Sequence, residues 1–270
     1  MAKAKATPGK AVVNYDEELA RQAASARKVE ESTTSSEFIS FKGGILQYQD
    51  APLPNNEMAV IIVDHILENV YYDQDYDPDT PTSPVCFAFG RADDEMEPHL
   101  IASDKQAATC AECDNNVFGS AEKGRGKACR NTRRLALIPA GKFAANGKLE
   151  LFDEDHFQSA SIAFAKLPVT SIKGWASFVK QTADTLFRPP HGIVTRIRVV
   201  PDAKTQFKVL FEPLVKVDND LMGIIMDRHN EAMKAIDFPY QPPEEQPERP
   251  ARGAKKPAGK KSPAAKRGKY

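Results

Sequence analysis

With 270 residues, 41% of them hydrophobic, the chain can bury the core of one large domain or two small ones. No apolar run approaches the roughly 20 residues that cross a bilayer, and residues 1–10 lack the apolar stretch of a signal peptide, so we expect a cytoplasmic protein without a membrane partner. The 37 basic and 37 acidic residues balance overall, but nine Lys/Arg in residues 249–270 and three in residues 1–10 leave 25 basic against 37 acidic residues between them, which excludes a body coated in cations for duplex DNA.

The amino-terminal part is predicted to be loosely structured. Residues 1–13 have the composition of a disordered segment, and residues 14–35 have helix-forming composition with only a thin apolar stripe, which predicts a helical arm. A β-rich body is predicted from residue 36 to residue 238. Within it, residues 38–48 have the pattern of a hairpin with a glycine turn, and residues 58–63 form a continuous apolar run typical of a strand buried on both faces.

Short strands continue along the body, and two amphipathic helices are predicted among them. The further strands are expected over residues 85–89, 134–138, 148–152, 161–166, 193–200 and 206–215, and the helices over residues 172–186 and 219–236. This pattern predicts an α+β, β-rich domain, built as an OB-like barrel or a sandwich, with a zinc-bound loop as an insertion. Residues 239–270 are rich in Pro and then in Lys, and they are predicted to form a disordered basic tail.

Four cysteines are the strongest chemical signal. Cys110 and Cys113 form a C-x-x-C pair, Cys86 precedes it, and Cys129 follows it, so none is left over. In a reducing compartment this spacing favours a metal over disulfides, and four thiolates leave no open position for water, so we predict one structural Zn²⁺ per chain. Three alternatives stay open: His99 in place of Cys86, a C-x-x-C with two unrelated buried thiols, and a redox C-x-x-C.

The loop around the last cysteine holds the densest basic cluster of the acidic body. Its cations are Lys123, Arg125, Lys127, Arg130, Arg133 and Arg134, and Phe118 lies beside them in the sequence. Single-stranded nucleic acid needs cations for its phosphates and rings for its bases, so this cluster is the predicted binding surface, with the basic tail as a second source of phosphate contacts. The alternative is a solvated loop whose charges offset the acidic residues 73–97.

A succession of short motifs between residues 37 and 215 carries a family resemblance. They lie at residues 38–44, 58–63, 84–86, 110–113, 118–120, 128–130, 133–136 and 168–171, together with Asn56 and Asn116. They resemble a family of tailed-bacteriophage zinc-binding proteins, mostly uncharacterised, of which some members are described as single-stranded-DNA-binding. The resemblance implies a role in phage DNA replication or recombination in the host cytoplasm, and it favours Cys86 over His99. The chain departs from that family's pattern by lacking an Asp-Gly turn after Cys86 and by having a basic rather than an acidic tail.

Three functional hypotheses follow. The first is a single-stranded-DNA-binding protein, which is not an enzyme and has no small-molecule substrate, because the sequence contains no nucleotide-binding glycine loop and no hydrolase motif. The second is an acidic interaction protein that docks on a replication or transcription enzyme, such as RNA polymerase. The third is a metal-dependent nuclease using Asp153, Asp155 and His156, for which a solvated turn is the favoured interpretation.

Overall fold

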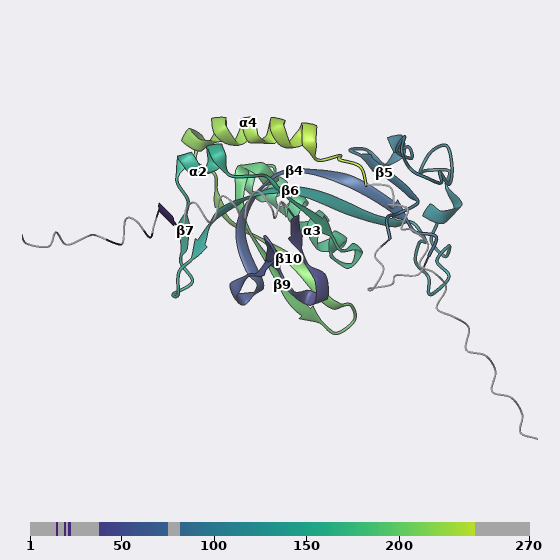
Figure 1. Cartoon of the computed structure of the whole chain (residues 1–270), viewed down its shortest axis with the longest axis horizontal. Helices are drawn as coiled ribbons and strands as arrows, with labels where there is room; N and C mark the ends of the chain where they lie inside the picture. Colours follow the sequence, from purple (N-terminus) through teal and green to yellow (C-terminus); the bar gives the residue numbers. More distant parts are fainter. Residues whose placement is uncertain (1–14, 16–18, 20, 23–37, 75–81, 241–270) are drawn as a thin grey trace, which may run out of the picture.

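The computed structural model describes residues 38–74 and 82–240, together with Tyr15, Leu19, Arg21 and Gln22 (Figure 1). These four residues are helical, at positions where the helical arm was predicted. The rest of that arm, the predicted disordered start and the basic tail from residue 241 lie outside the described residues.

One mixed sheet contains all ten strands of the described part of the chain. The strands are β1 (Phe38–Ser40), β2 (Gln47–Tyr48), β3 (Ala51–Pro52), β4 (Glu57–Tyr71), β5 (Cys86–Gly90), β6 (Arg130–Phe143), β7 (Leu149–Leu151), β8 (Ala163–Leu167), β9 (Ile193–Asp202) and β10 (Gln206–Lys216). Their order is β10-β9-β4-β6-β8-β1-β2-β3, with β5 paired to β4 and β7 paired to β6. The β1–β8 pair is parallel. The predicted α+β, β-rich class is confirmed, whereas an OB-like barrel stays a prediction.

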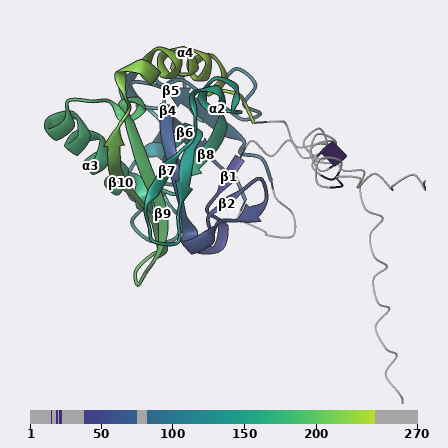
Figure 2. The same cartoon turned by 90° about the vertical axis from the view of Figure 1, so that its left-hand side faces the viewer.

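Helices cover both faces of this sheet, as Figures 1 and 2 show. They are α2 (Glu154–Ser159), α3 (Ile172–Gln181), which continues as a π-helical turn (Thr182–Leu186), and α4 (Asn219–Ala235). Trp175 and Phe178 of α3 belong to one buried cluster, and Ile225 and Ala232 of α4 belong to the other. Both predicted long helices are therefore present, each packed by its apolar stripe.

The first half of β4 lies between these two clusters. Met58, Val60 and Ile62 contribute to the α3 side, while Ala59 and Ile61 contribute to the α4 side, because successive side chains of a strand point to opposite faces. Burial on both faces explains why the sequence is continuously apolar here, and it confirms that part of the prediction. Each fully buried isoleucine contributes about 1.5–3 kcal/mol.

The second half of β4 has different neighbours. A register shift, or β-bulge, lies between Ile62 and Asp64 in the β4–β6 pairing. Beyond it β9 no longer pairs with β4, and β5 takes its place, from Leu67 opposite Gly90 to Tyr71 opposite Cys86. We call this end of the sheet, formed by β5, the second half of β4 and the start of β6, the distal end; in Figure 1 it lies at the right, beside the loops that follow β5.

Two local predictions need correction. Residues 153–156 form the start of α2 rather than a turn, because the Asp153 carboxylate caps the helix by accepting a hydrogen bond from the His156 amide at 3.0 Å. The ordered body also extends beyond residue 238. Tyr240 packs against Phe87 with 5.2 Å between ring centroids, so the end of the described chain belongs to the distal end.

Candidate metal centre and nucleic-acid surface

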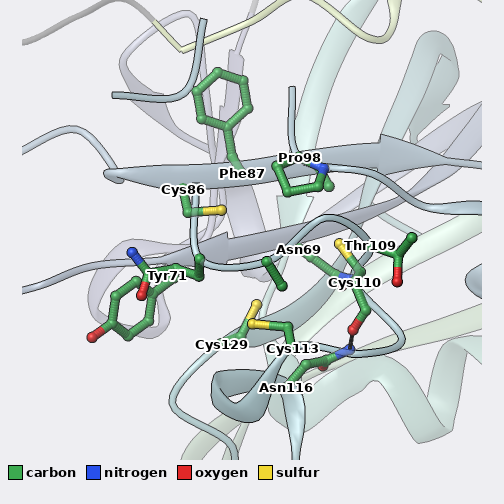
Figure 3. Close-up of a pocket in the computed structure, with 13 residues that line it drawn as sticks. Asn69, Tyr71, Cys86, Phe87, Pro98, Thr109, Cys110, Cys113, Asn116 and Cys129 are labelled. Atoms are coloured by element: carbon green, nitrogen blue, oxygen red, sulfur yellow. Dashed lines mark hydrogen bonds between the residues drawn. The ribbon is translucent and has the colours of Figure 1, made fainter. Parts of the chain in front are cut away.

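The four cysteines come together at the distal end (Figure 3). All four are buried free thiols, and they line one cavity of about 20 Å³, enough for a water-sized ligand or ion. Cys86 is the first residue of β5, and Cys129 directly precedes β6, so the pairing of both strands with β4 sets these two positions. The loop between β5 and β6 brings Cys110 and Cys113 to the same cavity.

Hydrogen bonds fix this loop, which we call the cysteine loop (residues 91–129), against the sheet. The Asn116 side chain donates to the Cys110 carbonyl at 2.8 Å and accepts from the Asn131 amide at 2.9 Å, and Asn131 also donates to Asn69 at 2.6 Å. The Cys129 amide donates to the Asn115 carbonyl at 2.7 Å. The cysteines are therefore held from β4, from β6 and from within the loop.

The environment of the thiols opposes their ionisation. Burial, and then charge repulsion from the three neighbouring cysteines, raise the pKa of Cys129 to about 12. Burial also raises the pKa of Cys86 and that of Cys110. A redox cysteine needs an exposed thiol with a lowered pKa, so the redox alternative does not fit these residues.

The donor set fits a structural zinc site in chemistry. Four cysteines line one cavity, and no cationic side chain is among its described lining residues, so a divalent ion would supply the positive charge that thiolates require. Within the described ranges, no three His, Cys, Asp or Glu side chains are already arranged as a metal site. Zinc therefore stays a proposal.

His99 lies apart from this cavity. Its ring stacks on Phe87 with centroids 5.1 Å apart and planes 19° apart, and its Nδ1 accepts a 3.4 Å hydrogen bond from the Ile101 amide. Cys86, in contrast, lines the cavity. The geometry therefore favours Cys86 as the fourth sulfur of the set.

The predicted nucleic-acid surface keeps its aromatic residue. Phe118 is 79% exposed, and the Lys127 ammonium lies 5.3 Å from its ring centroid while donating to the Asn116 side chain at 3.1 Å. Lys123 and Arg125 are exposed on the same loop. An exposed ring beside cations is thus present on a loop that is hydrogen-bonded to the sheet.

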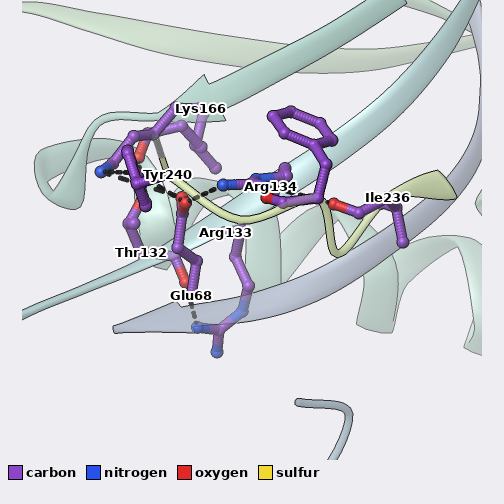
Figure 4. Close-up of polar contacts among 9 residues, drawn as sticks. Glu68, Thr132, Arg133, Arg134, Lys166, Ile236 and Tyr240 are labelled. Carbon is purple, nitrogen blue, oxygen red and sulfur yellow. Dashed lines mark hydrogen bonds and ion pairs between the residues drawn. The ribbon is translucent and has the colours of Figure 1, made fainter. Parts of the chain in front are cut away.

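Arg134 does not belong to this surface, which corrects the prediction (Figure 4). The residue is 4% exposed, and its guanidinium donates to Glu68 at 2.6 Å and to the Phe238 carbonyl at 2.6 Å. It also lies 4.3 Å from the Phe89 ring centroid. Arg134 therefore joins the sheet to the end of the described chain and is not accessible to an external ligand.

Arg130 and Arg133, the other two predicted cations of β6, lie on opposite faces of the sheet, because successive side chains of a strand alternate between faces. Arg133 is half-buried, which lowers its pKa, and it lines a cavity with Trp175. Arg130 is exposed, with its guanidinium 5.4 Å from the Tyr72 ring centroid. The predicted surface thus separates into a loop surface (Phe118, Lys123, Arg125 and Lys127), the exposed Arg130 beside Tyr72, the half-buried Arg133 in the cavity with Trp175, and the buried Arg134.

Sequence reasoning missed the amide contacts of the site. Asn69 and Asn131 are isolated amides inside strands, and an amide buried at such a position must have a partner. That was the available signal, but the partner itself comes only from the pairing of β4 with β6, which places Asn69 opposite Asn131.

Comparisons with known proteins leave the family open. No protein-family model, curated protein or solved structure matches the chain. Among the described residues, no helix combines the length and apolar character needed to cross a membrane. The resemblance to tailed-phage proteins therefore remains an expectation from the sequence motifs.

Proposed function

We propose that the protein binds single-stranded DNA through the loop surface, in phage DNA replication or recombination. The observation that carries this proposal is the exposed Phe118 ring with Lys127 beside it and Lys123 and Arg125 on the same loop. A base stacked on an aromatic ring contributes about 1–3 kcal/mol, and the cations would pair with the phosphates on either side. The phage setting rests on the family resemblance alone.

One structural Zn²⁺ is part of this proposal. Cys86, Cys110, Cys113 and Cys129 would bind it as thiolates, which offsets the raised thiol pKa values. When bound, the ion would cross-link β5, β6 and the cysteine loop without taking part in chemistry. A loop fixed before binding loses less conformational entropy when DNA orders it, which favours affinity.

The proposed fold is an OB-like barrel. Its support is that the sheet curls around the α3-side cluster, which gathers Phe41 and Leu46 from one end of the strand order and Val199 and Val209 from the other. Gly44 also approaches Phe207 of β10, with a Cβ placed on Gly44 only 3.4 Å from it. Sheets that curl in this way commonly present loops and strand faces to single strands.

Fluorescence anisotropy with a labelled oligothymidine tests the function. Phe118→Ala should weaken binding about tenfold, as expected for the loss of one stacked base. Phe187→Ala is the matched control, because Phe187 is an equally exposed phenylalanine after α3. If the wild-type protein does not bind the oligonucleotide at low salt, the proposal is wrong.

A second candidate function is docking on a nucleic-acid enzyme by acidic surface. Asp93, Asp94 and Glu95 form one exposed acidic turn at the start of the cysteine loop, in a body with excess negative charge. Retention of RNA polymerase on the immobilised protein, lost in an Asp94→Asn/Glu95→Gln variant, would select this function if the purified protein also ignores DNA.

A further inference from the structure

Two adjoining cavities lie along β8. The larger, of about 710 Å³, is lined by Tyr72, Arg130, Lys166 and Lys42 among others, and the smaller, of about 330 Å³, shares Lys42 and Lys166 with it and extends to Phe38. Because they share lining residues, we treat them as one groove, the β8 groove. Its larger part alone has the size of a small-ligand pocket, which is about 300–1,000 Å³.

The described lining of the β8 groove is basic. Lys42, Arg130 and Lys166 line it, and none of its described lining residues is an Asp or Glu. Behind Lys166, Glu68 lies 3.9 Å from the ammonium, but the same carboxylate also pairs with Arg134, so one anion serves two cations. The described lining residues therefore retain positive charge that a bound anion can neutralise.

A second cavity is also lined by cations, but acidic side chains lie beside them. Arg91, Arg133 and Lys180 line a cavity of about 500 Å³ beside α3, but Asp184 also lines it. The Arg91 guanidinium is moreover held by both Asp64 carboxylate oxygens, at 2.9 and 2.6 Å. The charge of Arg91 is therefore locally compensated, and Lys180 from this cavity is used below in a control variant.

Aromatic rings flank the cations of the β8 groove. At one end the Tyr72 ring lies beside Arg130, and at the other end Phe38 is 50% exposed with Phe207 lining the same cavity. Cations between rings are the arrangement that binds single-stranded nucleic acid without reading its sequence, because every base has a face that can stack. Free phosphate would use the cations but not the rings.

The end of the cysteine loop and the end of the described chain both lie next to the groove. Arg130 directly follows Cys129, so the groove begins where the cysteine loop ends. The Tyr240 hydroxyl lies 2.7 Å from the Lys166 ammonium and donates to Glu68 at 2.7 Å, which holds the end of the described chain beside the groove. The sequence that follows Tyr240 carries nine Lys/Arg from residue 249 onward.

We propose that the β8 groove is a second contact site for the same single strand that binds the loop surface. Lys42, Arg130 and Lys166 would neutralise its phosphates, and Tyr72 would stack on a base. The proposal rests on the proposed function, and it adds that the strand leaves the loop at Arg130 and continues along β8 toward Lys42.

Salt titrations of full-length protein with labelled oligothymidine test the groove. Lys42→Ala/Arg130→Ala should weaken binding about tenfold at low salt, and it should reduce the slope of log K against log salt by about 1.4, since each lost single-strand phosphate contact removes about 0.7. Lys173→Ala/Lys180→Ala on α3 is the charge-matched control and should leave both values unchanged. Melting curves show whether each variant is folded.

A cross-linking measurement on the wild-type chain avoids any folding defect. Irradiation with an oligonucleotide containing 5-iodouracil should give adducts at Tyr72 as well as at Phe118, identified by mass spectrometry. Adducts at Phe118 without Tyr72, together with an unchanged salt slope in the Lys42/Arg130 variant, would overturn the groove and leave the proposed function intact. Absence of any binding by the wild-type protein would reject both.

Discussion

β4 pairs with β9 from Glu57 to Ile61 and with β5 from Leu67 to Tyr71, while β6 lies on its other side from Ala59 to Val70. Residues 58–63 are apolar on both faces, whereas buried polar residues begin at Asp64. Asp64, Glu68 and Asn69 are all nearly inaccessible in this second half. The first half is stabilised by apolar burial, and the second half requires ion pairs, amide contacts and, in our proposal, a metal. A binding site needs polar groups at fixed positions. The second half provides them, but its stability depends on those polar contacts and, in our proposal, on the metal.

The largest expected effect is the loss of zinc, which should destabilise the second half of β4 and leave the first half unchanged. Purified wild-type protein should contain about one zinc per chain, and Cys110→Ser should lose it. Structural zinc contributes on the order of 10 kcal/mol of apparent binding free energy, comparable to the whole stability of a domain, so the distal end should open. Hydrogen exchange should then increase in β5 and the cysteine loop, while β9 and the first half of β4 stay protected.

Treatment of the wild-type protein with a chelator is the matched control for that experiment, because it changes no residue. It should reproduce the exchange pattern of Cys110→Ser. Wild-type protein that is metal-free as purified and equally protected at both ends would contradict the zinc proposal.

An intermediate effect is expected from the buried ion pair. Arg134→Met leaves the Glu68 carboxylate, which is 0% exposed, without its closest cation, and breaking a buried pair in this way costs about 3–5 kcal/mol. Ile61→Val, in the first half of β4, should cost only about 0.5–1.5 kcal/mol. Urea unfolding at neutral pH measures both.

The double variant Glu68→Gln/Arg134→Met removes the unpaired charge and should recover part of the loss. If Arg134→Met alone costs no more than Ile61→Val, the ion pair does not stabilise the distal end as we infer.

The smallest expected effect concerns pH at the boundary between the halves. His191 and His229 stack with centroids 4.6 Å apart, and His229 Nδ1 lies 2.6 Å from the carbonyl oxygen of Val63. Burial, and then the charge of His229, lower the pKa of His191 below 6.5. The unfolded chain therefore binds the proton more readily, so stability is complete above pH 6.5 and falls as the pH drops from there through the lower, folded pKa.

Melting temperatures of wild-type protein and His191→Gln at pH 7.5 and 5.5 measure this contribution. The wild-type protein should lose more stability on acidification than the variant does. An equal loss in both proteins would show that His191 does not contribute to the pH dependence.

Apolar patterns carried most of the fold prediction. Residues 58–63 predict a doubly buried strand because six consecutive apolar side chains need a core on each face. The bulge after Ile62 and the exchange of β9 for β5 were not predictable, since they depend on which strands pair over long distances in the sequence.

The candidate site was also predictable only in part. The cysteine set was predictable because its members share a distinctive chemistry and leave no cysteine over. The burial of Arg134 was not, because Arg133 and Arg134 look alike in sequence and alternate to opposite faces of β6. Neither was the β8 groove, since Lys42, Arg130 and Lys166 come from distant segments that only the β6–β8–β1 pairing brings together.

The hydroxyl of Tyr240 reaches a carboxylate 172 positions earlier in the chain, and this has a consequence for synthesis. Chains emerge from the ribosome with the amino terminus first, and contacts between distant segments form late. Glu68 must therefore wait for the final described residues before its surroundings are complete, whereas residues 86–129 can gather the four cysteines earlier. In the nascent protein the loop surface would be assembled before Tyr240 reaches Lys166.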